Sequence, residues 1–100
     1  MTVQGTQPLV DWVNDELSLI GAEFVTAMTK PAGPFSSVVY GSIDGHLVRL
    51  NFLTEPATGM CAVFLVSNQD TLPDRSSAAT FQEAIQNYEW AVAVDALSRA

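Results

Sequence analysis

The dipeptide Asp44-Gly45 lies between two runs of strand-forming residues, and it constrains the fold more than any other feature of the sequence. Type I′ hairpin turns require positive φ at both central residues, so Asp-Gly is a strong signal for such a turn. The flanking runs, 35–43 and 46–54, are rich in Val, Leu, Phe and Tyr. They predict two antiparallel strands joined by a two-residue turn.

A third strand-like run occupies 59–67, and residues 55–58 connect it to the second run. A connection this short can join only antiparallel neighbours, because a parallel crossover needs a dozen or more residues. We therefore expect a three-stranded antiparallel meander. The segment 30–34, KPAGP, predicts a loop before the meander, and the polar segment 68–77 predicts a loop after it.

Helical periodicity flanks the meander on both sides. Pro8 fits the first turn of an N-terminal helix, and apolar residues recur at helical spacing beyond it. Gly21 allows two interpretations: 22–29 is an extra strand, or, as we prefer, the helix continues to Met28. A last helix is expected to run to near residue 98. Three residues are candidates for its N-cap: Asp74, Ser76 or Ser77. The predicted fold is one α+β domain over 1–100, in the order α-β-β-β-α.

The two turns determine which residues share a face of the sheet, because directly paired residues point to the same side. Val39 is expected opposite Leu50, Leu50 opposite Val63, and Phe52 opposite Cys61. The face that packs against the helices is then Val39, Val48, Leu50, Phe52, Cys61, Val63 and Leu65. Whether both helices pack on this face, or one helix covers each face, stays open.

The single histidine and the single cysteine, His46 and Cys61, are not expected to form a site. In this register His46 lies opposite Ser67, about 20 Å from Cys61 at roughly 3.3 Å per residue, which is beyond hydrogen-bond reach. Asp44 and His46 alone cannot form a metal site, which needs three or four ligands, and no second histidine is present. We expect His46 to flank the turn and Cys61 to be a small buried hydrophobic residue, with no catalytic residue, cofactor or metal.

The other face of the sheet has few charges. Its predicted residues are Val38, Tyr40, Leu47, Arg49, Asn51, Leu53, Met60, Ala62, Phe64 and Val66. A solvated face would carry several charged side chains, whereas this one has only Arg49. Tyr40, Arg49 and Phe64 are expected to form a row with the guanidinium between two aromatic rings. Aromatic residues, Met and Arg are enriched in interface cores.

The last helix has a second apolar stripe. Trp90, Val94 and Leu97 are spaced i, i+4 and i+7, roughly opposite Phe81, Ile85 and Val92. Since one stripe can face the sheet, the other must meet solvent, the first helix or another chain, and a homodimer could bury it. The predicted interface residues are Tyr40, Arg49, Met60, Phe64, Val66, Trp90, Val94 and Leu97.

Charge narrows the choice of partner. The net charge is −7, and the four basic residues are dispersed, which argues against nucleic acid and against an anionic membrane. A lone cysteine and the absence of a signal peptide or an apolar run of transmembrane length favour the cytoplasm.

We therefore expect a non-catalytic, cytoplasmic protein-interaction domain of the chaperone, adaptor or inhibitor type. In its order of elements, size and acidity, the chain resembles dimeric secretion chaperones that bind effectors. The alternative is a small ligand-binding or hydrolytic domain, with a pocket near Glu16, Glu23 and Trp12.

Overall fold

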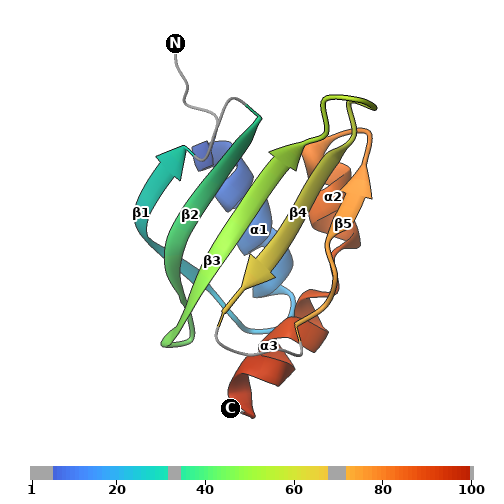
Figure 1. The fold of residues 1–100 in the computed structure, drawn as a ribbon. Helices are drawn as coiled ribbons and strands as arrows, with labels where there is room; N and C mark the ends of the chain where they lie inside the picture. The colour runs from blue at the N-terminus through green and yellow to red at the C-terminus, as the bar shows by residue number, and fades with distance from the viewer. Residues whose placement is uncertain (1–5, 32–34, 68–71, 100) are drawn as a thin grey trace.

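The computed structural model describes residues 6–31, 35–67 and 72–99 (Figure 1). The chain forms α1 (Thr6–Ser18), β1 (Phe24–Pro31), β2 (Ser36–Ile43), β3 (His46–Thr54), β4 (Cys61–Val66), β5 (Ser76–Ala78), α2 (Phe81–Asn87) and α3 (Trp90–Ser98). The strands form one five-stranded sheet in the order β1-β2-β3-β4-β5, and each neighbouring pair is antiparallel. The α+β class is therefore confirmed. The predicted three-stranded meander is its centre, β2-β3-β4, with one further strand on each side.

Gly21 ends the first helix. Its φ of 74° is in the left-handed region, its N–H bonds the Ser18 carbonyl at 3.2 Å, and the Ala22 N–H bonds the Leu17 carbonyl at 3.0 Å. This pair of bonds is a Schellman motif, which satisfies carbonyls at the end of a helix. Our preferred helix to Met28 was wrong, because the chain turns at Gly21 and continues as strand β1.

Asn14 of α1 fixes the start of β1. Its Oδ1 accepts a hydrogen bond from the Phe24 N–H at 2.7 Å, and its Nδ2 donates to the Phe24 carbonyl at 3.2 Å. One side chain therefore satisfies both backbone groups of Phe24. Phe24 itself is buried, so α1 and the outer strand are held together by packing as well as by polar contacts.

The first hairpin has the predicted geometry. Asp44 and Gly45 have φ values of 51° and 87°, and Ile43 pairs with His46, as a type I′ turn requires. The register between β2 and β3 is confirmed, including Val39 opposite Leu50.

The second hairpin differs from the prediction by two residues. Phe52 lies opposite Val63, not Cys61, and Thr54 lies opposite Cys61. The reason is the loop: the Glu55 N–H bonds the Met60 carbonyl at 2.8 Å, and Gly59 takes the positive φ of 74° that closes it. A shift of two residues leaves every side chain on its predicted face.

The C-terminal region forms two helices instead of one. Tyr88 is extended, with φ −69° and ψ 146°, and separates α2 from α3. The N-cap of α2 is Thr80, whose side chain accepts from the Glu83 N–H. The predicted caps were wrong, because Ser76 and Ser77 pair with β4 as strand β5 and Asp74 lies before that strand.

This break also changes which residues of the last helix are buried. Because Tyr88 is extended, the rotation of 100° per residue does not carry over from α2 to α3. Trp90 and Leu97 are buried in their own chain, Val94 is half-buried against the core, and Val92 is exposed. The prediction of a free stripe at Trp90, Val94 and Leu97 was therefore wrong.

The helices lie on one side of the sheet (Figure 1). Val13 and Leu17 of α1 and Ile85 of α2 form one buried cluster with sheet residues such as Leu50 and Val63. Of the two arrangements left open by the sequence, the structure has both flanking regions on the same face. We call the other side of the sheet the open face.

Candidate interaction surface

The register aligns the residues of the open face in rows that cross the strands. Val25, Ser42 and Leu47 form one row over β1, β2 and β3. The next row is Met28, Tyr40, Arg49 and Val66, from β1 to β4. Between Val25 and Met28 the first strand contains a β-bulge, which keeps both side chains on this face.

Large hydrophobic side chains are exposed in these two rows. Leu47 is 81% exposed, Val25 is 55% exposed and Met28 is 51% exposed. The neighbouring Val48, which points to the helices, is 4% exposed. Leu47 and Val48, which are adjacent in β3, therefore point to opposite faces of the sheet, one open and one packed against the helices. We define the open-face patch as Val25, Met28, Tyr40, Leu47, Arg49 and Val66.

The predicted aromatic row around Arg49 is not present. Arg49 lies opposite Tyr40 and Val66, whereas Phe64 lies opposite Asn51 in the next row. The two-residue shift of the second hairpin is the cause. No cation–π pair of Arg49 occurs among the described residues. Phe64 is half-buried and packs against the core cluster, so its ring is less available than was predicted.

A shallow hollow of about 380 Å³ lies within the open-face patch. Ala27, Leu47 and Val66 provide apolar walls, and Tyr40 and Arg49 provide polar groups. Small sites of this kind usually combine apolar lining with a few polar groups that fix orientation. The hollow could accept an apolar side chain next to an anionic group. A second hollow, of about 730 Å³, lies between Phe64 and the segment 72–75.

Basic residues are concentrated on the open face. Lys30 lies opposite Val38, which places it in the row next to Arg49, and Arg75 extends from the segment that enters β5. These are three of the four basic residues of the chain, since Arg99 ends α3. Among the described residues, no carboxylate forms an ion pair with Lys30 or Arg49.

The acidic residues are mostly elsewhere. Asp11, Asp15 and Glu16 lie in α1, Glu83 lies in α2 and Asp95 lies in α3. The helical side is therefore acidic, and the open face carries positive charge that no described carboxylate pairs, although the chain as a whole is negative.

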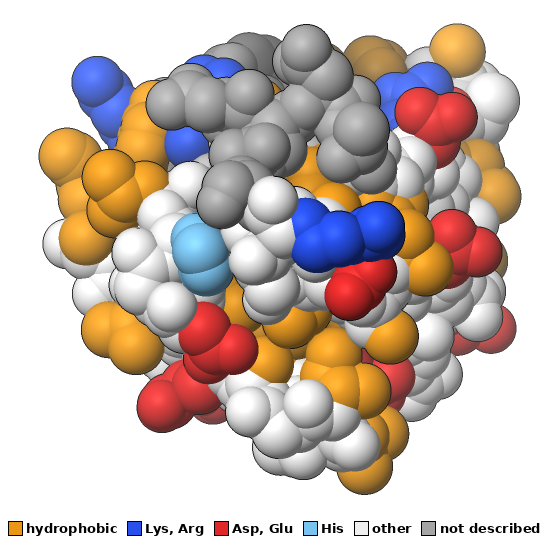
Figure 2. Space-filling model, turned by 90° about the horizontal axis from the view of Figure 1, so that it is seen from below, with side chains coloured by type: hydrophobic (Ala, Val, Ile, Leu, Met, Phe, Trp, Pro, Cys, Tyr) orange, Lys and Arg blue, Asp and Glu red, His pale blue; other side chains and the backbone are white. Residues whose placement is uncertain are grey.

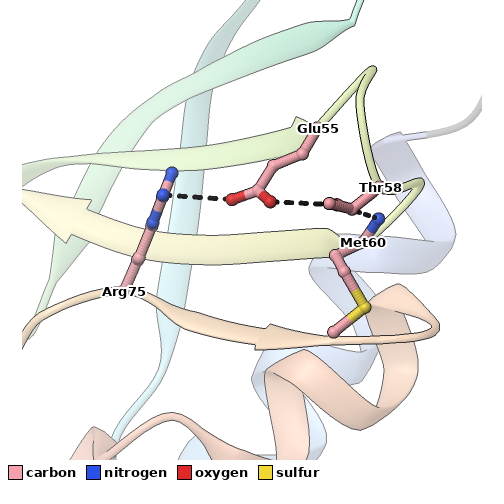
Figure 3. A network of polar contacts seen from close by, with 4 residues as sticks. All are labelled: Glu55, Thr58, Met60 and Arg75. Carbon is pink, nitrogen blue, oxygen red and sulfur yellow. Dashed lines mark hydrogen bonds and ion pairs between the residues drawn. The ribbon is translucent and has the colours of Figure 1, made fainter.

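The part of the open face over β4, toward β5, is partly covered by an ion pair (Figure 3). Arg75 Nη2 lies 3.0 Å from Glu55 Oε2, and the pair passes over β4. Thr58 Oγ1 donates to Glu55 Oε1 at 3.1 Å and accepts from the Met60 N–H at 3.2 Å. Ala62, beneath this network, is fully buried although it points away from the helices.

Three other residues considered in the sequence analysis, His46, Cys61 and Met60, lie outside the open-face patch. His46 is half-buried beside the turn, and Cys61 is half-buried instead of fully buried because it lies at the end of β4, opposite Thr54. Met60 is half-buried in the Glu55 network.

The residues of the alternative ligand pocket do not line either hollow. Glu16 is half-buried, Glu23 is exposed, and Trp12 packs against the core cluster. Trp12 therefore has a structural role that accounts for its position in α1.

Sequence reasoning missed Val25, Met28 and Lys30. The signal was present: FVTAMT contains β-branched and aromatic residues that favour a strand. The helical interpretation of 22–29 removed Val25 and Met28 from the sheet, and the predicted loop 30–34 removed Lys30, whereas β1 continues to Pro31.

Hydrophobic side chains also gather in several separate places when the molecule is seen from below (Figure 2). Exposed apolar surface alone does not identify a site. What distinguishes the open-face patch is its position on a sheet face beside Arg49 and Lys30, which form no ion pair with the described carboxylates.

Within the described ranges, no group of three or more His, Cys, Asp or Glu residues could hold a metal ion. In the same residues, no helix has the length and apolar character needed to cross a bilayer. No family model, curated protein or solved structure matches the chain.

Proposed function

We propose that the chain is a non-catalytic protein-interaction domain whose docking surface is the open face of the sheet. One observation carries this proposal: three large hydrophobic side chains, Leu47, Val25 and Met28, are exposed together on a sheet face that the described helices leave uncovered. Contiguous exposed apolar surface usually marks an interaction site on a folded domain. Chaperone, adaptor and inhibitor roles all need such a surface and no catalytic group.

Self-association is a second use of the same surface. The helix stripe that suggested a homodimer is buried, but two open faces could pack on each other across a twofold axis. A cytoplasmic location fits this proposal, since Cys61 has no cysteine partner within the chain.

Site-specific photo-crosslinking tests the proposal. The crosslinking residue benzoylphenylalanine would replace Leu47 in one variant and Leu19 in a matched control. Leu19 is also a leucine and is 78% exposed, close to the 81% of Leu47, but it follows α1 on the helical side. Both variants should first show the same thermal unfolding as the parent chain.

In cells that express the two variants, we expect crosslinks between the chain and another protein molecule from position 47 and few from position 19. The mass of the product separates the two uses, because a product of twice the chain mass indicates a second copy. Equal labelling at both positions, or no product at position 47, would contradict an open-face docking surface.

A further inference from the structure

We infer that the occupant of the open face is an acidic amphipathic helix of another protein, which lies across the sheet and pairs carboxylates with Arg49 and Lys30. This inference rests on the proposed function and specifies the partner. It follows from the charge of the open face, from the apolar side chains beside that charge, and from the edge of the sheet. A second copy of the chain is then compared as an occupant.

Charge selects an acidic partner. Arg49 and Lys30 lie on the open face with no carboxylate of the described residues in ion-pair range, whereas Arg75 is neutralised by Glu55. These two cations stand on a chain whose net charge is −7, so their position is not a consequence of a generally basic surface. Complementary charge accelerates encounter and suppresses wrong partners.

Apolar contact accompanies these cations. Leu47 lies two residues from Arg49 on the same face of β3, and Met28 lies in the same row as Arg49. The hollow between Leu47 and Val66 contains the Arg49 side chain in its lining. A partner with apolar residues and adjacent carboxylates therefore matches both components of the patch.

The sheet edge disfavours an added strand. The sheet has two outer strands, β1 with eight residues and β5 with only three, so β1 offers the longer edge to a partner strand. That edge contains a β-bulge, Lys30 and Pro31, and Asn14 already occupies both backbone groups of Phe24. Bulges, lysine and proline are the features that protect edge strands from pairing. The face is left as the docking surface, and helices are the elements that ordinarily cover a sheet face.

A second copy of the chain fits less well. Two open faces packed across a twofold axis would bring Arg49 and Lys30 of both copies to one interface, where Glu55, the carboxylate that the described residues place on this face, is already paired with Arg75. The acidic α1 of a second copy offers the right charge, but its Val10, Val13 and Leu17 are buried in its own core. Another protein is therefore the better occupant.

Two labelled peptides test the inference with the full chain. Both are helical and carry leucines along one face; the first has glutamates beside the leucines, and the second has lysine in place of every glutamate. Fluorescence anisotropy measures binding at low salt. We expect the glutamate peptide to bind at least about tenfold more tightly, an advantage of about 1.4 kcal/mol that added NaCl reduces.

Variants then assign the preference to the open face. The double substitution Lys30→Glu and Arg49→Glu should reverse the peptide preference, whereas Arg99→Glu, which changes the cation at the end of α3, should leave it unchanged. Leu47→Asp should abolish binding of the glutamate peptide, and Leu19→Asp should not. Circular dichroism should show that the bound peptide is helical.

Several results would overturn the inference. They are equal binding of the two peptides, binding of neither, a glutamate preference that survives the double substitution, or a bound peptide that is extended. If both peptides bind equally and Leu47→Asp abolishes this binding, the charge assignment fails while the open face remains the docking surface. Absence of crosslinks at position 47 would instead remove the proposed function itself.

Discussion

Arg75 and Glu55 form an ion pair across a strand that contributes neither residue. Arg75 precedes β5, Glu55 follows β3, and Ala62 of β4 is buried between them on the open face. The small Ala62 side chain leaves room for the pair to pass over β4, whereas a larger residue would raise it from the sheet. The ion pair thereby lies to one side of the open-face patch, which extends over β1, β2 and β3 to Val66 at the end of β4.

The first prediction concerns the strength of this ion pair. Both side chains keep substantial exposure, 49% for Arg75 and 28% for Glu55, so water screens their attraction. A double-mutant cycle with Arg75→Ala and Glu55→Ala should give a coupling energy of about 0.2–1 kcal/mol in urea unfolding. The coupling should fall in roughly 1 M NaCl. A coupling that is independent of salt would show that the contact is not governed by screened charge.

A second prediction concerns Gly41 and Gly45, which are glycine for different reasons: Gly41 lacks space for a side chain, and Gly45 has a positive φ. A Cβ on Gly41 would lie 2.2 Å from the Val25 carbonyl oxygen and 2.7 Å from the Phe24 ring, so the space is already filled. A Cβ on Gly45 would meet nothing within 4 Å, but φ there is +87°. Gly41→Ala should therefore destabilise by about 1–3 kcal/mol through overpacking against backbone, and Gly45→Ala by about 1–2 kcal/mol through backbone strain.

Asparagine distinguishes these two mechanisms because it tolerates positive φ better than alanine. Gly45→Asn should be milder than Gly45→Ala, whereas Gly41→Asn should be worse than Gly41→Ala. Thermal unfolding of the four variants measures the order. The same order of alanine and asparagine at both positions would contradict the assignment.

The third prediction uses neighbouring residues of β3. Leu47 is exposed on the open face and Val48 is buried toward the helices. Leu47→Asp should change the free energy of unfolding by less than about 0.5 kcal/mol, as for most surface substitutions. Val48→Asp should prevent stable folding, because it buries a carboxylate without a partner. Circular dichroism melting of the two variants decides this, and a large loss of stability in Leu47→Asp would mean that the open face is covered.

Tyr88 gives a prediction with a pH dependence. Its hydroxyl donates to the Pro73 carbonyl at 3.0 Å and accepts from the Leu65 N–H at 3.4 Å, beyond the end of the β4–β5 pairing. Burial raises the pKa of Tyr88 above its ordinary value of 10.0, and the charges of Asp74 and Glu89 act in the same direction. Tyr88→Phe should cost about 1–3 kcal/mol near neutral pH, because the buried Leu65 N–H and the half-buried Pro73 carbonyl lose their partner.

Alkaline pH should reduce the difference in the free energy of unfolding between the parent chain and Tyr88→Phe. The Tyr88 contribution is fully present below pH 10.0, where the phenol is protonated in both states. Above this pH the unfolded chain releases the proton first, so stability is lost progressively up to the raised pKa of the folded state. Urea unfolding at about pH 9 and about pH 11 should show the parent chain losing more stability than Tyr88→Phe. An equal loss in both proteins would show that Tyr88 is not the group that titrates.

The sequence by itself determined the features that depend on neighbouring residues. Asp44-Gly45 specified a turn with positive φ at both positions, and the two-residue alternation assigned Val48 and Leu47 to opposite faces. A register error of two residues did not disturb this assignment, because alternate residues of a strand share a face. The prediction that Arg49 is the charged residue of this face therefore holds for β2, β3 and β4, whereas Lys30, Glu55 and Arg75 reach the open face from segments that were predicted as loops or connections.

Only the tertiary structure decided the outcomes that depend on distant residues. The segment after Gly21 became a strand because it could pair with β2 and because Asn14 of α1 bonds Phe24. The last helix divided at Tyr88, where the hydroxyl reaches Pro73 and Leu65, and this division buried Trp90. Local dihedral preferences differ by about 1 kcal/mol or less for most residues, whereas burial of one large side chain contributes about 1.5–3 kcal/mol. Where the two compete, packing between distant segments determines the structure.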